Sequence, residues 1–106
     1  MNILFVCEFN QVRSRTAEAI YQENNQVKVL SAGTHPRARV ELSEALIEWA
    51  DIIFAMEDEQ EEYILEYFSH ALGHRKLVNL DIYKPYKFMD EILVKEIREK
   101  VEPWLN

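Results

Sequence analysis

A cysteine and an arginine, Cys7 and Arg13, stand near the start of the sequence with five residues between them, and Ser14 follows directly. A deprotonated cysteine is a nucleophile. A guanidinium presents a planar fork of N–H donors that matches two oxygens of a phosphate group. These residue types at this spacing predict attack by Cys7 on the phosphorus of a phosphate that Arg13 holds.

The five intervening residues are enough to form a tight curl whose backbone N–H groups point inward. The start of a helix behind the curl would add free N–H donors and the positive end of its dipole. Such a cradle fits a tetrahedral oxyanion. We expect Ser14 to hydrogen-bond the thiolate and to make it a better leaving group. The residues predicted to bind substrate in this loop are Glu8, Phe9, Asn10, Gln11, Val12 and Ser14.

Short apolar runs alternate with helical patterns along the chain. Continuous apolar runs are typical of strands buried on both faces, and apolar residues at i, i+3 and i+4 indicate helices between them. We expect one domain over residues 1–106, of the α/β class, with a four-stranded parallel sheet flanked by helices on both faces. The phosphate loop would follow the first strand, at the carboxyl edge where such sheets bind ligands. The predicted strands are Ile3–Val6, Val27–Leu30, Ile52–Ala55 and Lys76–Leu80.

Three groups of residues carry a resemblance to a known family. They are Leu4–Cys7 with Asn10, Arg13–Ser14 and Ala17–Glu18; Ser31–Thr34; and Trp49–Met56. In this order along the chain they resemble the low-molecular-weight protein tyrosine phosphatases, whose fold is shared with arsenate reductases. The chain looks like a short branch of that family, and it departs from the family's loop where Phe9 replaces a usual glycine. Phe9 has a Cβ, so we expect Asn10 to supply any left-handed turn.

The resemblance implies a phosphomonoesterase that hydrolyses aryl phosphates or phosphotyrosine through a phosphocysteine intermediate. Its substrate would be a phosphorylated protein or a small aryl phosphate, and its product inorganic phosphate. It implies no metal and no cofactor, with Cys7 as nucleophile and Arg13 as phosphate ligand.

The general acid is the point where the residue-by-residue match fails. The family supplies an Asp from an Asp-Pro-aromatic loop after the fourth strand, and that Asp protonates the leaving oxygen. Here Asp81 follows that strand and is the predicted acid, with Asp90 as the alternative, although Asp90 is also explained as a helix N-cap. Neither is followed by proline. Tyr83 and Tyr86 could flank an aromatic substrate, or could simply pack within the loop.

Three other functions remain open on the same residues. A reductase of arsenate would need an external thiol such as glutathione, because the chain has one cysteine. A cysteine phosphocarrier would not need Arg13. A binding module would hold phosphoryl groups without turning them over.

Composition excludes some partner classes. The net charge is −7, and ten acidic residues with no Lys or Arg lie between Arg39 and Arg75. Nucleic acid and anionic membrane surfaces are therefore not expected partners, since both call for a basic face. No apolar run approaches the ~20 residues that span a bilayer, and the first residues lack a secretory pattern. We expect a cytoplasmic protein. We expect no metal site, because its three histidines are scattered along the sequence.

Overall fold

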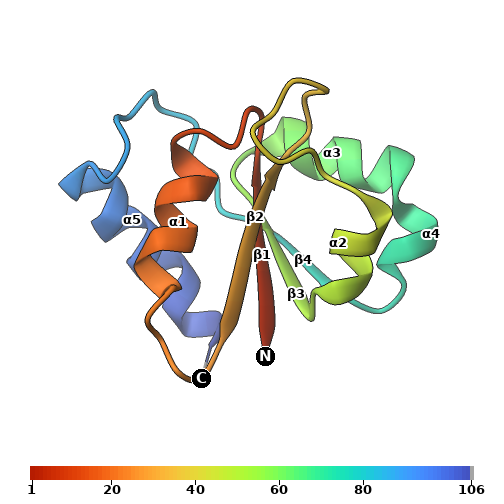
Figure 1. Cartoon of the computed structure of the whole chain (residues 1–106), viewed down its shortest axis with the longest axis horizontal. Coiled ribbons are helices and arrows are strands. Elements are labelled where there is room, and N and C mark those ends of the chain that lie inside the picture. The colour runs from red at the N-terminus through yellow and green to blue at the C-terminus, as the bar shows by residue number, and fades with distance from the viewer. Residues whose placement is uncertain (106) are drawn as a thin grey trace.

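The computed structural model describes residues 1–105, and in it strands and helices alternate along the chain (Figure 1). The elements are β1 (Asn2–Cys7), α1 (Arg13–Tyr21), β2 (Lys28–Gly33), α2 (Glu44–Trp49), β3 (Ile52–Ala55), α3 (Asp58–Tyr67), α4 (Ser69–Leu72), β4 (Lys76–Asn79), α5 (Glu91–Val101) and the short 3₁₀ helix η1 (Glu102–Trp104).

The four strands form one parallel sheet in the order β2-β1-β3-β4. The predicted fold class is confirmed, and the strand ends lie within one residue of their predicted positions except in β2, which continues three residues past Leu30 to Gly33. Strand β1 is one of the two central strands, and Cys7 is its last residue, paired with Gly33 of β2. The thiol therefore stands at the carboxyl edge of the sheet, where the loops after β1, β2, β3 and β4 meet.

Each face of the sheet has its own hydrophobic core. Successive side chains of a strand point to opposite faces, so Ile3 and Phe5 pack with α1 and α5, while Leu4 and Val6 pack with α2, α3 and α4. Figure 1 shows α1 and α5 on one side of the sheet and the other three helices on the opposite side. All four of these side chains have no solvent exposure. Because β1 is buried on both faces, its end is a fixed point from which the following loop starts.

The segment between β4 and α5 has no regular secondary structure, yet its backbone is anchored at several points. Ile82 is buried, and its N–H donates to the carbonyl of Met56, the residue after β3 (2.6 Å). Further along, the N–H of Met89 donates to the hydroxyl of Thr16 on α1 (3.0 Å). These anchors lay the 80–90 segment beside the first turn of α1.

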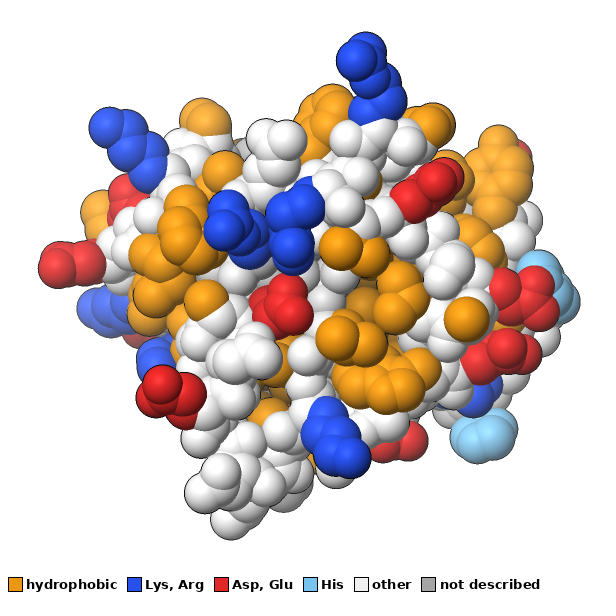
Figure 2. Space-filling model, in the orientation of Figure 1, with side chains coloured by type: hydrophobic (Ala, Val, Ile, Leu, Met, Phe, Trp, Pro, Cys, Tyr) orange, Lys and Arg blue, Asp and Glu red, His pale blue; other side chains and the backbone are white. Residues whose placement is uncertain are grey.

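The surface mixes charges of both signs. Figure 2 shows Lys and Arg side chains scattered over one face among apolar and acidic ones, without a continuous basic area. Among residues 1–105, no helix combines the length and apolar character that crossing a bilayer requires.

Candidate active site

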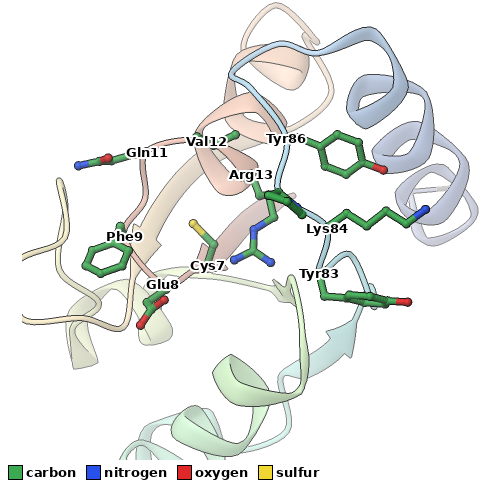
Figure 3. Close-up of a pocket in the computed structure, with 10 residues that line it drawn as sticks. Cys7, Glu8, Phe9, Gln11, Val12, Arg13, Tyr83, Lys84 and Tyr86 are labelled. Atoms are coloured by element: carbon green, nitrogen blue, oxygen red, sulfur yellow. The ribbon is translucent and has the colours of Figure 1, made fainter.

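A pocket of about 320 Å³ opens at the carboxyl edge of the sheet, with Cys7 in its wall (Figure 3). The residues that line it come from the loop after β1 and from the segment after β4; they are Cys7, Glu8, Phe9, Gln11, Val12, Arg13, Tyr83, Lys84, Pro85 and Tyr86. The volume is at the lower end of the range for small-molecule sites. The structure thus brings together eight of the residues that the sequence singled out.

The carbonyl groups at the start of the loop all point away from the pocket. They accept hydrogen bonds from the segment that follows β2: Cys7 from the N–H of Thr34 (3.0 Å), Glu8 from that of His35 (3.0 Å), Phe9 from that of Arg39 (3.0 Å), and Asn10 from Nε of Arg39 (3.1 Å). In a trans peptide the C=O and the next N–H point in opposite directions. The amides after these carbonyls therefore face inward, and the N–H of Asn10 reaches Sγ of Cys7 (3.2 Å).

Asn10 makes the turn that closes the curl. Its φ is 57°, the left-handed region, as the sequence predicted from the Cβ of Phe9. Asn10 is fully buried, and its Nδ2 donates to the hydroxyl oxygens of Ser14 (2.7 Å) and Ser31 (2.8 Å). The hydroxyl of Ser31 donates in turn to the carboxylate of Glu18. A short left-handed turn is thus held from behind by a chain of buried polar groups.

Ser14 presents a proton to the thiol. Its Oγ lies 2.9 Å from Sγ of Cys7 and accepts a hydrogen bond from the Asn10 amide, which can only donate through Nδ2. The hydroxyl hydrogen is consequently free to point at the sulfur, its other acceptor being the carbonyl of Ala32 at 3.5 Å. Asn10 and Ser14 were predicted to bind substrate; the structure places both behind the loop, where they contact the nucleophile and do not line the pocket.

Arg13 is held along one edge of its guanidinium. Its Nη1 donates to Oε2 of Glu57 (2.6 Å) and to the carbonyl of Ile82 (2.7 Å). Within residues 1–105, no hydrogen bond engages Nη2 or Nε, so these donors remain for an anion. Figure 3 shows the guanidinium beside the Cys7 sulfur. The arrangement points a fork of donors at the position that a phosphate above the sulfur would take.

Helix α1 begins at Arg13 with its positive end uncompensated. No side chain caps its first turn, and that turn contains no acidic residue. The first N–H groups of a helix have no partner within it. Together with the inward amides, they form a neutral, fixed set of donors suited to a tetrahedral anion.

The far rim of the pocket is tied to α5. The hydroxyl of Tyr86 donates to Oε1 of Glu96 (2.9 Å), and this bond raises the pKa of the phenol. Burial on its own would raise the pKa of Glu96, but hydrogen bonds from Lys100 and Tyr86 and the charge of Lys84 bring the pKa below its usual value. Figure 3 shows Tyr83, Tyr86 and the Lys84 side chain directed away from the Cys7 sulfur. The two tyrosines line the pocket, but their rings do not close over it.

Neither predicted acid lines the pocket. Asp81 lies in a neighbouring hollow, beside Tyr83 and the acidic start of α3. Its φ is 55°, and its N–H donates to the Asn79 side chain (2.8 Å). Asp90 caps α5, accepting from the N–H of Ile92 (2.8 Å). The left-handed turn at Asp81 lies two residues after the end of β4, and it was not predicted from the sequence.

Two parts of the site were not identified from the sequence. Glu57, which fixes Arg13, lay in an acidic run that is typical of a solvated helix face. The rim residues Lys84 and Pro85 were also overlooked. The Pro85-Tyr86 pair was the available signal, because the expected loop contains Pro followed by an aromatic residue.

The chain matches known proteins in sequence and in fold. Residues 2–44 match the family model described as low molecular weight phosphotyrosine protein phosphatase. The resemblance to the low-molecular-weight phosphatases is confirmed. No curated protein matches the chain.

Solved structures that include arginine and tyrosine phosphatases match over nearly the whole chain. A YwlE mutant from Bacillus subtilis is 26% identical, with a TM-score of 0.71 over 99% of this chain and 93% of that one. The YwlE arginine phosphatase from Geobacillus stearothermophilus is 25% identical, with a TM-score of 0.71 over 98% and 87%. The tyrosine phosphatase Wzb from Escherichia coli K30, in complex with phosphate, shares the fold at 19% identity, with a TM-score of 0.76 over 98% and 95%.

The buried turn at Asn10 gives a stability prediction. Asn10→Ala removes two hydrogen bonds and puts a Cβ-bearing residue without a polar side chain at φ 57°. We expect a loss of about 2–4 kcal/mol in the free energy of unfolding, measured in urea. Asn10→Gly loses the same bonds without the backbone strain and should retain about 1 kcal/mol more. Wild-type stability in both variants would contradict the role of this turn.

Gly33, the last residue of β2, packs closely against the backbone of the loop after β1. A Cβ at this position would lie 2.4 Å from the carbonyl oxygen of Glu8 and 2.7 Å from the Cβ of Ala38. Gly33→Ala should displace the loop backbone and weaken binding of inorganic phosphate, measured by calorimetry, by about tenfold or more. Adding Ala38→Gly removes only the second clash, so the double variant should not recover. Recovery would mean that the loop itself is not displaced.

Proposed function

We propose that the chain is a phosphomonoesterase that transfers a phosphoryl group first to Cys7 and then to water. The observation that carries this proposal is the loop of inward N–H groups between a thiol that receives a hydrogen bond and a guanidinium with two free donors. The family match of residues 2–44, which contain this loop, supports it.

The first step begins with a phosphate dianion in the loop. The inward amides, the first turn of α1 and the free edge of Arg13 bind its equatorial oxygens. The Cys7 thiolate forms the S–P bond as the P–O bond to the leaving group breaks. Because the donors are already oriented, they stabilise the added charge of the transition state without reorganisation.

The second step releases the enzyme. Water attacks the phosphocysteine, the S–P bond breaks, and inorganic phosphate leaves. The electron pair returns to sulfur, where the Ser14 hydroxyl at 2.9 Å stabilises the departing thiolate. This is covalent catalysis with electrostatic stabilisation, and every group it uses lies at the end of β1, in the loop that follows or on α1.

The rim favours an aryl phosphate. Phe9 is 41% exposed, and its ring packs against His35 with 4.6 Å between centroids. Tyr83 lines the other side of the pocket with its ring directed away from the Cys7 sulfur, so the exposed Phe9 ring is the apolar surface that a flat ring bearing the phosphate would contact. The matched structures include both an arginine phosphatase and a tyrosine phosphatase.

Two alternatives share the anion site and differ in turnover. A binding module would hold phosphate without cleaving an ester. An arsenate reductase would form the same bond from Cys7 to an oxyanion but would need an external thiol, since Cys7 is the only cysteine. Measured hydrolysis therefore separates the proposed function from the first, and glutathione-dependent arsenate reduction identifies the second.

The roles of Cys7 and Arg13 give a kinetic prediction. With p-nitrophenyl phosphate, Cys7→Ser should abolish turnover and still bind inorganic phosphate, because the amides and Arg13 remain. Arg13→Lys loses the fork and should weaken phosphate binding and kcat/KM by about 10²-fold or more. Arg98→Lys, the same change on α5 away from the pocket, is the control. Turnover retained in Cys7→Ser would contradict the mechanism.

The acid role of Asp81 stays a prediction, and its position weighs against it. Asp81 lines a hollow shared with Glu57 and Glu59 and does not line the pocket of Cys7. We expect Asp81→Asn to keep kcat within about twofold of wild type, whereas loss of a general acid lowers rates by roughly 10²–10⁴-fold. Glu59→Gln removes a charge from the same hollow and is the control. A large fall confined to Asp81→Asn would restore Asp81 as the acid.

A further inference from the structure

The rim of the pocket carries a lysine where an acid is expected. The three consecutive residues Lys84, Pro85 and Tyr86 all line it. They match the Asp-Pro-aromatic loop of the resembled family at the proline and at the aromatic residue, but not at the acid. Within the described part of the chain, no aspartate lines this pocket, and its one carboxylate is Glu8.

Lys84 does not replace the missing proton donor. Figure 3 shows its side chain running away from the Cys7 sulfur. Its ammonium lies close enough to Glu96, on α5, to lower the pKa of that carboxyl. A group directed to α5 is out of reach of an oxygen that leaves from phosphorus above Cys7, since proton transfer needs hydrogen-bond contact.

Glu8 lies on the opposite wall. It belongs to the loop itself, and Figure 3 shows its carboxylate on the side of Phe9, away from the 83–86 segment. The leaving group of an in-line attack departs on the side of phosphorus opposite the sulfur. Glu8 is still the one carboxylate among the residues that line the pocket, so any test must include it.

Building on the proposed phosphoryl transfer, we propose that this site accepts phosphoryl donors whose leaving group departs as a stable anion. Acyl phosphates and the phosphate esters of acidic phenols belong to this class. Ordinary phosphotyrosine does not, because the phenolate of tyrosine is a much stronger base.

The step balances without a protein acid. The Cys7 thiolate forms the S–P bond, the P–O bond breaks, and its electron pair stays on the leaving carboxylate or nitrophenolate. Water then cleaves the phosphocysteine, and its proton goes to solvent. A site without a carboxylate beside the attacking water hydrolyses this intermediate slowly, so the intermediate accumulates and a burst of the first product precedes steady turnover.

The first experiment compares leaving groups with the whole chain. Wild type is assayed with acetyl phosphate, p-nitrophenyl phosphate, phenyl phosphate and a phosphotyrosine peptide. We expect single-turnover rates on the last two to be at least about 10²-fold below those on the first two, the range that a general acid normally supplies. Equal rates on phenyl and p-nitrophenyl phosphate would overturn the inference.

The second experiment restores the acid. Lys84→Asp should raise the single-turnover rate on phenyl phosphate by about tenfold or more and leave the rate on p-nitrophenyl phosphate nearly unchanged. Lys84→Asn separates the loss of the cation from the gain of the acid and should show no selective gain. Lys87→Asp makes the same charge change outside the pocket and is the matched control. A gain on phenyl phosphate in Lys84→Asn or Lys87→Asp equal to that in Lys84→Asp would refute the role of position 84.

A third experiment tests Glu8. If Glu8→Gln abolishes turnover of phenyl phosphate selectively, Glu8 is the donor and the inference is wrong. If Glu8→Gln changes the rates on phenyl phosphate and p-nitrophenyl phosphate by the same factor, the inference stands. Failure of the proposed function looks different: wild type would then transfer no phosphoryl group to Cys7 even from acetyl phosphate, as seen by mass spectrometry of the acid-quenched protein.

Discussion

The site depends on one constraint, the outward orientation of the first four carbonyls of the loop. The segment after β2 engages all four, and this leaves the following amides no direction but inward. The segment is itself in place because β2 pairs with β1 up to Cys7 and Gly33. Strand pairing and loop shape are therefore a single structural unit, and the polarity of the pocket follows from backbone geometry more than from side chains.

An anion site in an acidic molecule is consistent with that geometry. The net charge is −7, and Arg13, whose guanidinium lies beside the thiol, is already paired with Glu57. What remains for the ligand is a set of neutral N–H dipoles at short range and one free edge of a guanidinium. Fixed dipoles act within a few ångströms, where they outweigh the more distant acidic side chains that solvent screens.

The sequence predicted well what local pattern determines. The four strands, the loop after the first of them and the left-handed turn at Asn10 all depend on residues close together in the chain. The ion-pair partner of Arg13 was not predicted. Glu57 lies 44 positions further along the chain, in a run of acidic residues that looks alike throughout. The residues at the rim of the pocket were still harder to predict. Segment 80–90 has no periodicity, and the left-handed turn at Asp81, with φ 55°, is not marked by the pattern of residues around it.

The lone thiol has a chemical consequence beyond catalysis. Cys7 is deep in its pocket at 3% exposure, and the chain holds no second sulfhydryl. Oxidation of a reactive cysteine to the sulfenic acid is normally halted when a neighbouring thiol condenses with it to a disulfide. Here that protection has to come from a small molecule able to enter the pocket, such as a free thiol of the surrounding solution. Otherwise the sulfur proceeds to the sulfinic state and the site is lost.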